Sequence, residues 1–316
     1  MVRRRILRLG KNLLNRLNLF RLLRGIGICS SFCETNGVKV WQRSAEQMAV
    51  FDRWVLLKTV LNDHPRRVIH FLHIPKTGGT TIASALGSDS RFAVISMDTS
   101  SEVFQYQLAQ LSDLDQKKIV IIRGHHAFSL LEDSGVVEDV HLSFSTIRDP
   151  AEIQASNVNM ILRRVAAFLG QERQNREEAE YAKRWLLAMG GRFEPTAEFA
   201  LEILASTAYL REMGQVYSKF LGGSGWEKAL ASGRYVCIER EDVDFLLGEC
   251  FGYSSTPARK NVTYGGPISA EMIPQELKRD LIRNDYRIFD QLRRNALDRR
   301  RIRQTFAPLL ARTSSS

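Results

Sequence analysis

A lysine, two glycines and three threonines stand directly after an apolar stretch of the sequence. The stretch, Val68–Ile74, has the β-branched character of a buried parallel strand. The residues that follow it are Lys76, Thr77, Gly78, Gly79, Thr80 and Thr81. A strand, a glycine turn and a helix start bring several backbone N–H groups together, and the helix terminus adds partial positive charge. The pattern therefore predicts a cradle for an anion, with Lys76 as a full cation.

The order of these residues restricts the kind of cradle. An NTP-hydrolysing Walker A loop places its lysine after the second glycine, whereas Lys76 precedes both glycines. The order disfavours such a loop. The alternative to an anion site is purely structural: the two glycines would only form the turn between the strand and the helix.

A second polar cluster ends the predicted strand His141–Arg148. Arg148 offers a two-pronged donor for a phosphate dianion, and Ser156 lies two helical turns further on as another donor. Asp149 and Pro150 fit the cap and the first position of that helix. The alternative is an arginine that only forms a salt bridge at a strand end.

Two adjacent histidines follow a third apolar strand, Lys117–Gly124. Imidazole titrates near neutral pH without perturbation, so it suits the removal of a proton from a hydroxyl group. Adjacent residues of an extended segment point in opposite directions, so only one of the two can face a cleft. We assign His125 as the base and keep His126 in reserve. A histidine hydrogen-bonded within the wall of the sheet is the alternative.

The segment His73–Thr81, HIPKTGGTT, resembles the 5′-phosphosulfate loop of sulfotransferases that use 3′-phosphoadenosine 5′-phosphosulfate (PAPS). It is most similar to the carbohydrate group that includes heparan sulfate 2-O-sulfotransferase, and the resemblance spans Arg67–Ala296 through short separated motifs. It implies PAPS as donor, with Lys76 on the bridging oxygen of the leaving phosphate. The residues Thr77–Thr81 would hold the 5′ group through backbone and hydroxyl donors. Positioning and electrostatics dominate sulfuryl transfer, so no metal is required.

The segment Arg148–Ser156 resembles the 3′-phosphate site of the same family, R-D-P-x-x-R-x-x-S. This implies that Arg148 and Ser156 bind the 3′-phosphate. The sequence departs from the pattern at Ile153, where the family usually has a second arginine, and a weakened donor site is one consequence. Similar sulfotransferases also place a histidine after the glycine of a preceding strand, which agrees with His125 as the base.

Weaker matches lie downstream. Arg259 and Lys260 resemble the segment that closes over the nucleotide, and are predicted as further donor contacts. The pair Glu239-Arg240 resembles a strand-end pair with a structural role. The sequon at Asn261 would matter only in a secretory compartment.

Strands alternate with helices through much of the chain. Further strands are predicted at Phe92–Met97 and Tyr235–Arg240, and Ala151–Leu221 is nearly all helical. The alternation predicts an α/β fold with a P-loop-type doubly wound parallel sheet flanked by helices, and a largely helical insertion on the acceptor side. Ligands bind at the carboxyl ends of the strands in such sheets, so we expect Lys76, His125 and Arg148 to meet at one edge.

Basic residues are concentrated at the N-terminus. The net charge is +10, and residues 1–33 hold eight basic residues and no acidic one. The nearly neutral remainder gives no argument for nucleic acid as a partner. A basic amphipathic helix here could lie on an anionic membrane, dock a partner, act as a signal-like segment or pack on its own domain.

The domain prediction is a helical extension over residues 1–62, a sulfotransferase domain over 63–300 and a basic flexible tail over 301–316. No transmembrane run is found, which favours a cytoplasmic protein, and residues 1–33 are the segment that could contact an anionic membrane from that side. The four cysteines are too few and too scattered for a disulfide scaffold. The sequence does not indicate an oligomeric state.

The patterns together predict a PAPS-dependent O-sulfotransferase acting on a carbohydrate or glycoconjugate hydroxyl by in-line attack. Two rival functions stay open. A P-loop-type kinase or NTPase would need Mg²⁺ and a Walker-type aspartate. A nucleotide-binding or membrane-docking protein on a degenerate scaffold would show no turnover.

Overall fold

The computed structural model describes residues 45–63, 67–113, 119–172, 174–221, 223, 225–253 and 266–311. The chain forms two compact units, Met1–Val50 and Phe51–Ser316. Apart from the start of the first helix, all described elements belong to the second unit. The predicted helix within residues 1–33 and the sequon at Asn261 lie outside the described residues.

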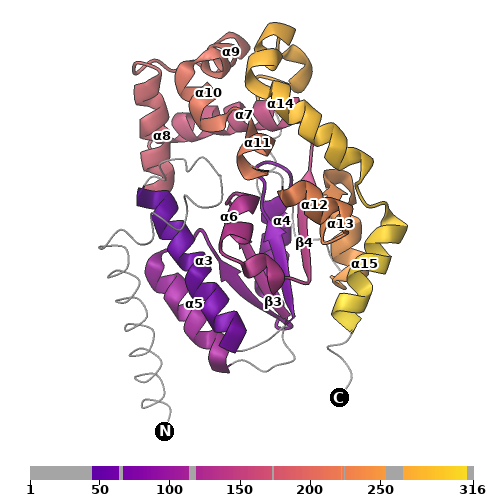
Figure 1. Ribbon diagram of the computed structural model, residues 1–316. Helices are drawn as coiled ribbons and strands as arrows, with labels where there is room; N and C mark the ends of the chain where they lie inside the picture. The colour runs from indigo at the N-terminus through magenta and orange to yellow at the C-terminus, as the bar shows by residue number, and fades with distance from the viewer. Residues whose placement is uncertain are drawn as a thin grey trace, which may run out of the picture. The chain divides into compact units, whose positions relative to one another are not determined.

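The second unit is built on a five-stranded parallel sheet in the order β2-β3-β1-β4-β5 (Figure 1). The strands are β1 (Val68–Leu72), β2 (Phe92–Ser96), β3 (Ile119–Gly124), β4 (Leu142–Ile147) and β5 (Tyr235–Glu239). Every residue of the central strand β1 is buried, as its continuous apolar run requires when helices cover both faces. The predicted α/β fold with a doubly wound parallel sheet is confirmed.

The connections reverse direction between β1 and β4. After β1 the chain moves to β2 and β3 on one side, and then crosses to β4 and β5 on the other. A sheet of this kind opens a crevice at the carboxyl ends of the two strands where the direction changes. The loops after β1 and β4 therefore border the natural ligand site of the fold.

Helices surround the sheet. They are α3 (Ala45–Asp63), α4 (Gly79–Ser88), α5 (Ser101–Asp113), α6 (Phe128–Asp133), α7 (Pro150–Leu169), α8 (Arg176–Ala188), α9 (Ala197–Ala205), α10 (Thr207–Met213), α11 (Val216–Phe220), α12 (Gly225–Ala231), α13 (Val243–Phe245), α14 (Gln275–Arg294) and α15 (Arg299–Ala311). Short 3₁₀ helices lie at Val136–Glu138, Arg240–Asp242 and Ala270–Met272, and a π-helical turn at Leu246–Cys250 continues α13.

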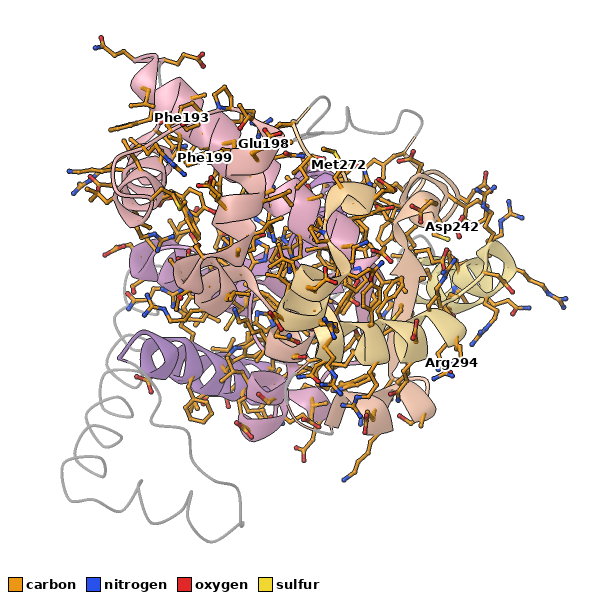
Figure 2. The ribbon with its side chains drawn as sticks, turned by 90° about the horizontal axis from the view of Figure 1, so that it is seen from above. Phe193, Glu198, Phe199, Asp242, Met272 and Arg294 are labelled. Atoms are coloured by element: carbon orange, nitrogen blue, oxygen red, sulfur yellow. The ribbon has the colours of Figure 1, made fainter. Side chains whose placement is uncertain are left out.

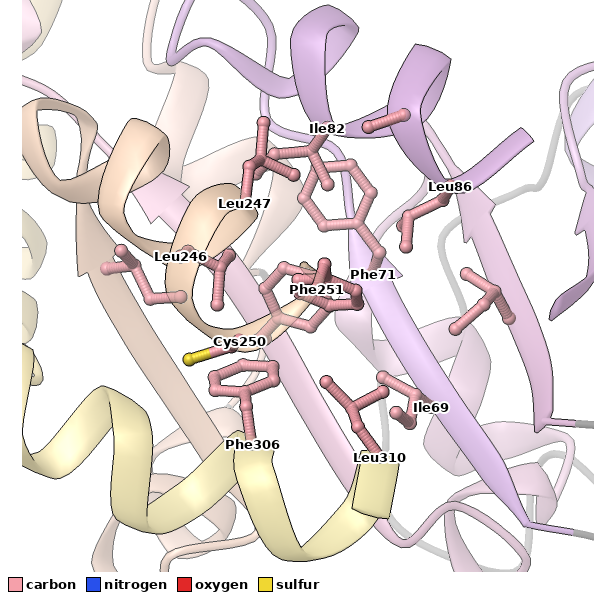
Figure 3. Close-up of a cluster of buried hydrophobic side chains, with 14 of the residues drawn as sticks. Ile69, Phe71, Ile82, Leu86, Leu246, Leu247, Cys250, Phe251, Phe306 and Leu310 are labelled. Atoms are coloured by element: carbon pink, nitrogen blue, oxygen red, sulfur yellow. The ribbon is translucent and has the colours of Figure 1, made fainter. Parts of the chain in front are cut away.

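One apolar core lies between the sheet and the helices α4, α13 and α15 (Figure 3). Phe71 of β1 stacks on Phe144 of β4 with ring centroids 4.8 Å apart, and Phe306 of α15 meets Phe144 edge-on at 5.3 Å. Ile82 and Leu86, one helical turn apart on α4, pack into the same cluster. This core fixes the start of α4, and with it the loop after β1.

The predicted flexible tail is wrong for residues 301–311. These residues continue α15, which buries Ile302, Phe306 and Leu310. The three apolar residues recur every fourth position and form one face of the helix, while the arginines of α15 stay exposed. The prediction of a flexible tail rested on the high arginine content and overlooked this helical spacing.

A second core holds the helices α7 to α10 and α14 together. Trp185 of α8 and Tyr209 of α10 are fully packed within it, and Phe193 meets Phe199 of α9 edge-on at 6.3 Å (Figure 2). The chain from Thr207 to Phe220, part of the segment predicted to be nearly all helical, forms two helices, α10 and α11. The break falls at Gly214, where a β-carbon would overlap the carbonyl oxygen of Leu210.

Two further properties concern the described residues. Cys237 and Cys250 are buried free thiols. No described helix combines the length and the apolar character that a membrane crossing needs.

Candidate active site

Three loops meet at the carboxyl edge of the sheet, because β3, β1 and β4 are neighbours there. Hydrogen bonds join them directly. Arg148 Nη1 donates to the carbonyl oxygen of Lys76 at 3.3 Å, and His125 Nδ1 lies 2.7 Å from the carbonyl oxygen of His73. The structure therefore joins the three loops that carry Lys76, Arg148 and His125, with the Lys76 and His73 carbonyl oxygens as the points of contact.

The loop after β1 has the backbone of an anion cradle. Lys76 and Gly78 have φ angles of 66° and 96°, in the left-handed region, which costs energy for a lysine but not for a glycine. Gly78 is the N-cap of α4, and no side chain caps that helix. The Thr81 amide donates to the Gly78 carbonyl oxygen at 3.1 Å, so among the described residues the amides of Gly79 and Thr80 are the ones left to water or to a ligand.

The threonines of this loop differ in what they can donate. The Thr77 hydroxyl is buried, donates to the carbonyl oxygen of Ile74 at 2.8 Å and lies 2.6 Å from the Thr146 hydroxyl. Its single proton is thus committed, so this hydroxyl is not a free donor for the 5′ group, in contrast to the expectation of a hydroxyl donor. Thr80 is exposed and Thr81 is buried.

Lys76 is half-buried among other cations. Its Nζ atom lies 2.9 Å from the Met160 sulfur. Burial, together with Arg164, Arg163 and Arg148, lowers the pKa of Lys76 to about 8. A bound anion would offset both causes, so the site favours a negatively charged ligand.

The backbone of Arg148 is fixed on both sides by one hydroxyl. Tyr217 accepts from the Arg148 amide at 2.8 Å and donates to the Arg148 carbonyl oxygen at 2.7 Å. Asp149 caps α7 by accepting from two amides of its first turn, and Pro150 is the first residue of that helix. These contacts aim the Arg148 side chain at the loop after β1.

The guanidinium of Arg148 is only partly engaged. Its Nε donates to Glu152 at 2.6 Å, one turn along α7, and Nη1 reaches Lys76. Nη2 has no hydrogen-bond partner in the part of the chain that the structure describes. The salt bridge that the alternative interpretation of Arg148 predicted is present, with Glu152 as its partner. The Nη2 group can still donate to a ligand.

The helix α7 places Ser156 and Ile153 differently. Ser156 is half-buried, two turns after Arg148. Ile153 has 1% of its surface exposed, so the position where the family pattern has a second arginine points into the protein.

Further along α7 the sequence interpretation missed Met160, Arg163 and Arg164. They follow Ser156 at intervals of four, seven and eight residues, which keeps them near one face of the helix. Arg164 lies above the Tyr181 ring, 4.9 Å from its centroid, and pairs with Glu178 at 3.8 Å. The helical spacing from Ser156 was the signal that could have revealed them.

His125 and His126 point in opposite directions, as the extended segment predicts. His125 is exposed at the edge of the site. A carbonyl oxygen only accepts, so the bond to His73 places the proton of a neutral His125 on Nδ1 and leaves the Nε2 lone pair available. His73, whose ring centroid is 4.0 Å from that of His125, packs on Gly79 and links the base to the loop.

His126 belongs to the interior and cannot act as the reserve base. Its Nε2 lies 2.9 Å from Nε2 of His70, whose Nδ1 lies 3.2 Å from the Ser143 hydroxyl. Trp54 meets the His126 ring edge-on at 4.6 Å. Burial lowers the pKa of His70 to about 3 and holds the pKa of His126 well below its usual value, so both rings are neutral at pH 7.

The remaining predicted contacts are only partly described. Arg259 and Lys260 lie outside the described residues. Glu239, at the end of β5, accepts from Arg293 Nε at 3.2 Å, which agrees with a structural role. Within the described ranges, no three His, Cys, Asp or Glu side chains gather so as to hold a metal ion.

Comparisons with known proteins give one similar structure. No family model and no curated protein matches the sequence. The crystal structure of mouse sulfotransferase SULT7A1 complexed with PAP aligns with a TM-score of 0.40 at 12% identity, covering 79% of this chain and 93% of that one. A similarity at this level carries no functional argument, so the function is argued from the site itself.

Proposed function

We propose that this protein transfers a sulfuryl group from PAPS to a hydroxyl group of a carbohydrate or glycoconjugate. The observation that carries the proposal is the junction of the loops after β3, β1 and β4, where Arg148 donates to the Lys76 carbonyl oxygen and His125 Nδ1 bonds the His73 carbonyl oxygen. It combines cations for two phosphate groups with an imidazole for a hydroxyl proton, the set that the sequence motifs call for.

The residues present fit the donor. The uncapped start of α4 and Lys76 would hold the 5′-phosphosulfate. The open prong of Arg148 and the Ser156 hydroxyl would hold the 3′-phosphate. The lowered pKa of Lys76 supports this assignment, because two phosphate groups supply the negative charge that this cationic site favours.

The sulfuryl transfer step depends on two residues, His125 and Lys76. The acceptor oxygen bonds to sulfur while the bond from sulfur to the 5′-phosphate oxygen breaks. His125 Nε2 takes the proton of the acceptor hydroxyl, and Lys76 donates a hydrogen bond to the leaving oxygen as its negative charge develops. The products are a sulfate ester and adenosine 3′,5′-bisphosphate.

Calorimetric titration with adenosine 3′,5′-bisphosphate, beside ATP with Mg²⁺, tests the donor site. We expect the bisphosphate to bind the wild type and the exposed-arginine control Arg279→Ala alike, and to bind Arg148→Ala at least tenfold more weakly. A preference for ATP with Mg²⁺ would favour the kinase or NTPase. Binding of neither would favour the degenerate scaffold.

Transfer of label from ³⁵S-PAPS to a panel of neutral and anionic oligosaccharides tests the acceptor class. His125→Gln should bind the bisphosphate normally but lose roughly 100-fold or more in turnover, the usual range for a general base. Turnover unchanged in His125→Gln would exclude His125 as the base.

A further inference from the structure

The turn after β2 meets the candidate base through its backbone. The amide of His125 donates to both carboxylate oxygens of Asp98, at 2.9 and 2.8 Å. Asp98 follows β2 by two residues, on the strand next to β3, so it lies at the same carboxyl edge as the site. The sequence interpretation did not select it.

The approach of Asp98 depends on a glycine in β3. A β-carbon on Gly124 would lie 2.9 Å from Asp98 Oδ1 and 2.9 Å from His126 Nδ1. The absence of a side chain at Gly124 therefore lets the carboxylate reach the amide of the next residue. Asp98 also acts electrostatically on Arg123, whose guanidinium is largely buried.

The turn that carries Asp98 is itself held in place. Arg53 of α3 donates from Nη1 to the carbonyl oxygens of Met97 and Thr99, each at 2.7 Å, so it brackets Asp98 on both sides. Its guanidinium also lies over the Phe104 ring of α5 at 5.4 Å. The Met97 amide donates to the Arg123 carbonyl oxygen at 2.8 Å and so extends the sheet ladder to this turn.

We propose that Asp98 is a positioning residue for His125. Its carboxylate fixes the peptide plane at the end of β3, the fixed peptide lets Nδ1–H of His125 donate to the His73 carbonyl oxygen, and this bond turns the Nε2 lone pair toward the acceptor hydroxyl. The inference rests on the proposed role of His125 as a base, yet the imidazole geometry it describes can be measured without any reaction.

The alternative role for Asp98 is direct chemistry, as a base or an acceptor contact of its own. The two roles differ in what the Asp98→Asn variant retains. An amide oxygen still accepts from the His125 N–H but cannot take a proton, so positioning predicts near-normal behaviour in Asp98→Asn and a defect in Asp98→Ala.

The test uses the full chain with ¹⁵N-labelled histidine, and assigns the His125 ring signals by their loss in His125→Gln. In the neutral imidazole of the wild type we expect Nδ1 protonated and Nε2 unprotonated. Asp98→Ala should shift toward the tautomer mixture of a free histidine, and Asp98→Asn and the exposed-carboxylate control Asp290→Asn should keep the wild-type tautomer.

Turnover of ³⁵S-PAPS with the oligosaccharide panel completes the test. Asp98→Ala should lose roughly 100-fold, the cost of a small misplacement of a reacting group, while its affinity for adenosine 3′,5′-bisphosphate stays within about twofold. A wild-type tautomer in Asp98→Ala, or an equal loss in Asp98→Asn, overturns the proposal. Failure of the wild type to bind the bisphosphate would instead reject the proposed function, and the tautomer measurement would still decide the role of Asp98.

Discussion

The His73 ring packs so closely on Gly79 that a β-carbon at position 79 would overlap it. Gly79 is the first residue of α4, and His73 carries the carbonyl oxygen that receives the His125 bond. Gly79 is therefore needed because the His73 ring occupies the space of a β-carbon. Its own φ angle does not require a glycine, since the left-handed glycine of this loop is Gly78.

Replacement of Gly79 by alanine should displace the His73 ring and distort the loop. We expect Gly79→Ala to weaken adenosine 3′,5′-bisphosphate binding by about tenfold or more, because the first-turn amides lose their alignment. Gly87→Ala is the matched control. It lies in the same helix with no atom within 4 Å of the added carbon, and should raise the free energy of unfolding by about 0.5–1 kcal/mol with binding unchanged. Equal binding by both variants would contradict the fit described for Gly79.

The pKa of Lys76 predicts how donor binding depends on pH. The pKa in the folded protein is about 8, below the usual 10.5, and a bound anion favours the protonated form. The free protein loses this proton as the pH rises through 8, so bisphosphate affinity should fall above pH 8, by up to about tenfold per pH unit. Calorimetry at pH 7, 8 and 9 measures the slope.

Lys76→Arg provides the control, because a guanidinium stays charged throughout this range. Its affinity should be nearly constant from pH 7 to 9, and an equal decline in both proteins would assign the slope to another group. The same shift affects stability. The unfolded chain binds more protons between pH 8 and 10.5, so the Lys76 contribution to folding becomes more favourable as the pH rises there.

Tyr217 predicts a link between stability and the 3′ side of the site. Its buried hydroxyl satisfies both the amide and the carbonyl oxygen of Arg148. Tyr217→Phe should lower the free energy of unfolding by about 1–3 kcal/mol, since two backbone groups lose their partner, and should weaken bisphosphate binding. Urea unfolding and calorimetry measure both effects. In Tyr106→Phe, where the ring is 64% exposed, stability and binding should stay near the wild-type values; the same behaviour in Tyr217→Phe would refute the link.

Much of the fold was predictable because the strands are short apolar runs, each ended by a polar or glycine residue. Val68–Leu72 is apolar enough to be buried on both faces of a sheet, and β1 is buried at every position. Because the strands are parallel, Lys76, His125 and Arg148, which follow three of them, lie at one edge of the sheet. The opposite orientation of His125 and His126 likewise follows from the two-residue period of an extended chain.

Contacts that involve backbone groups could not be predicted from the sequence. Asp98 acts on the amide of His125, and a motif of side-chain types does not record such a bond. The Thr77 hydroxyl donates to the Ile74 carbonyl oxygen and also contacts the Thr146 hydroxyl, on a strand that only the folded sheet brings near. The strand-end rule could have selected Asp98, since it follows the predicted strand Phe92–Met97 directly, but its partner required the structure.

Ile153 separates two explanations of the departure from the family pattern. A lost ligand predicts that Ile153→Arg restores donor affinity. Burial predicts no gain in affinity, because the Ile153 side chain is 1% exposed and a cation at this position loses its water.

We expect Ile153→Arg to lower the free energy of unfolding by about 3–5 kcal/mol without tighter bisphosphate binding, and Ile153→Val to cost about 0.5–1.5 kcal/mol. Denaturant unfolding with and without the bisphosphate measures both. If Ile153→Arg instead binds tenfold more tightly at unchanged stability, the helix admits a cation toward the site, and the isoleucine marks a weakened donor site. The burial of Ile153 favours a loss of stability without tighter binding. In that case Arg148, directly before the cap of α7, is the cation of this segment that binds the 3′-phosphate.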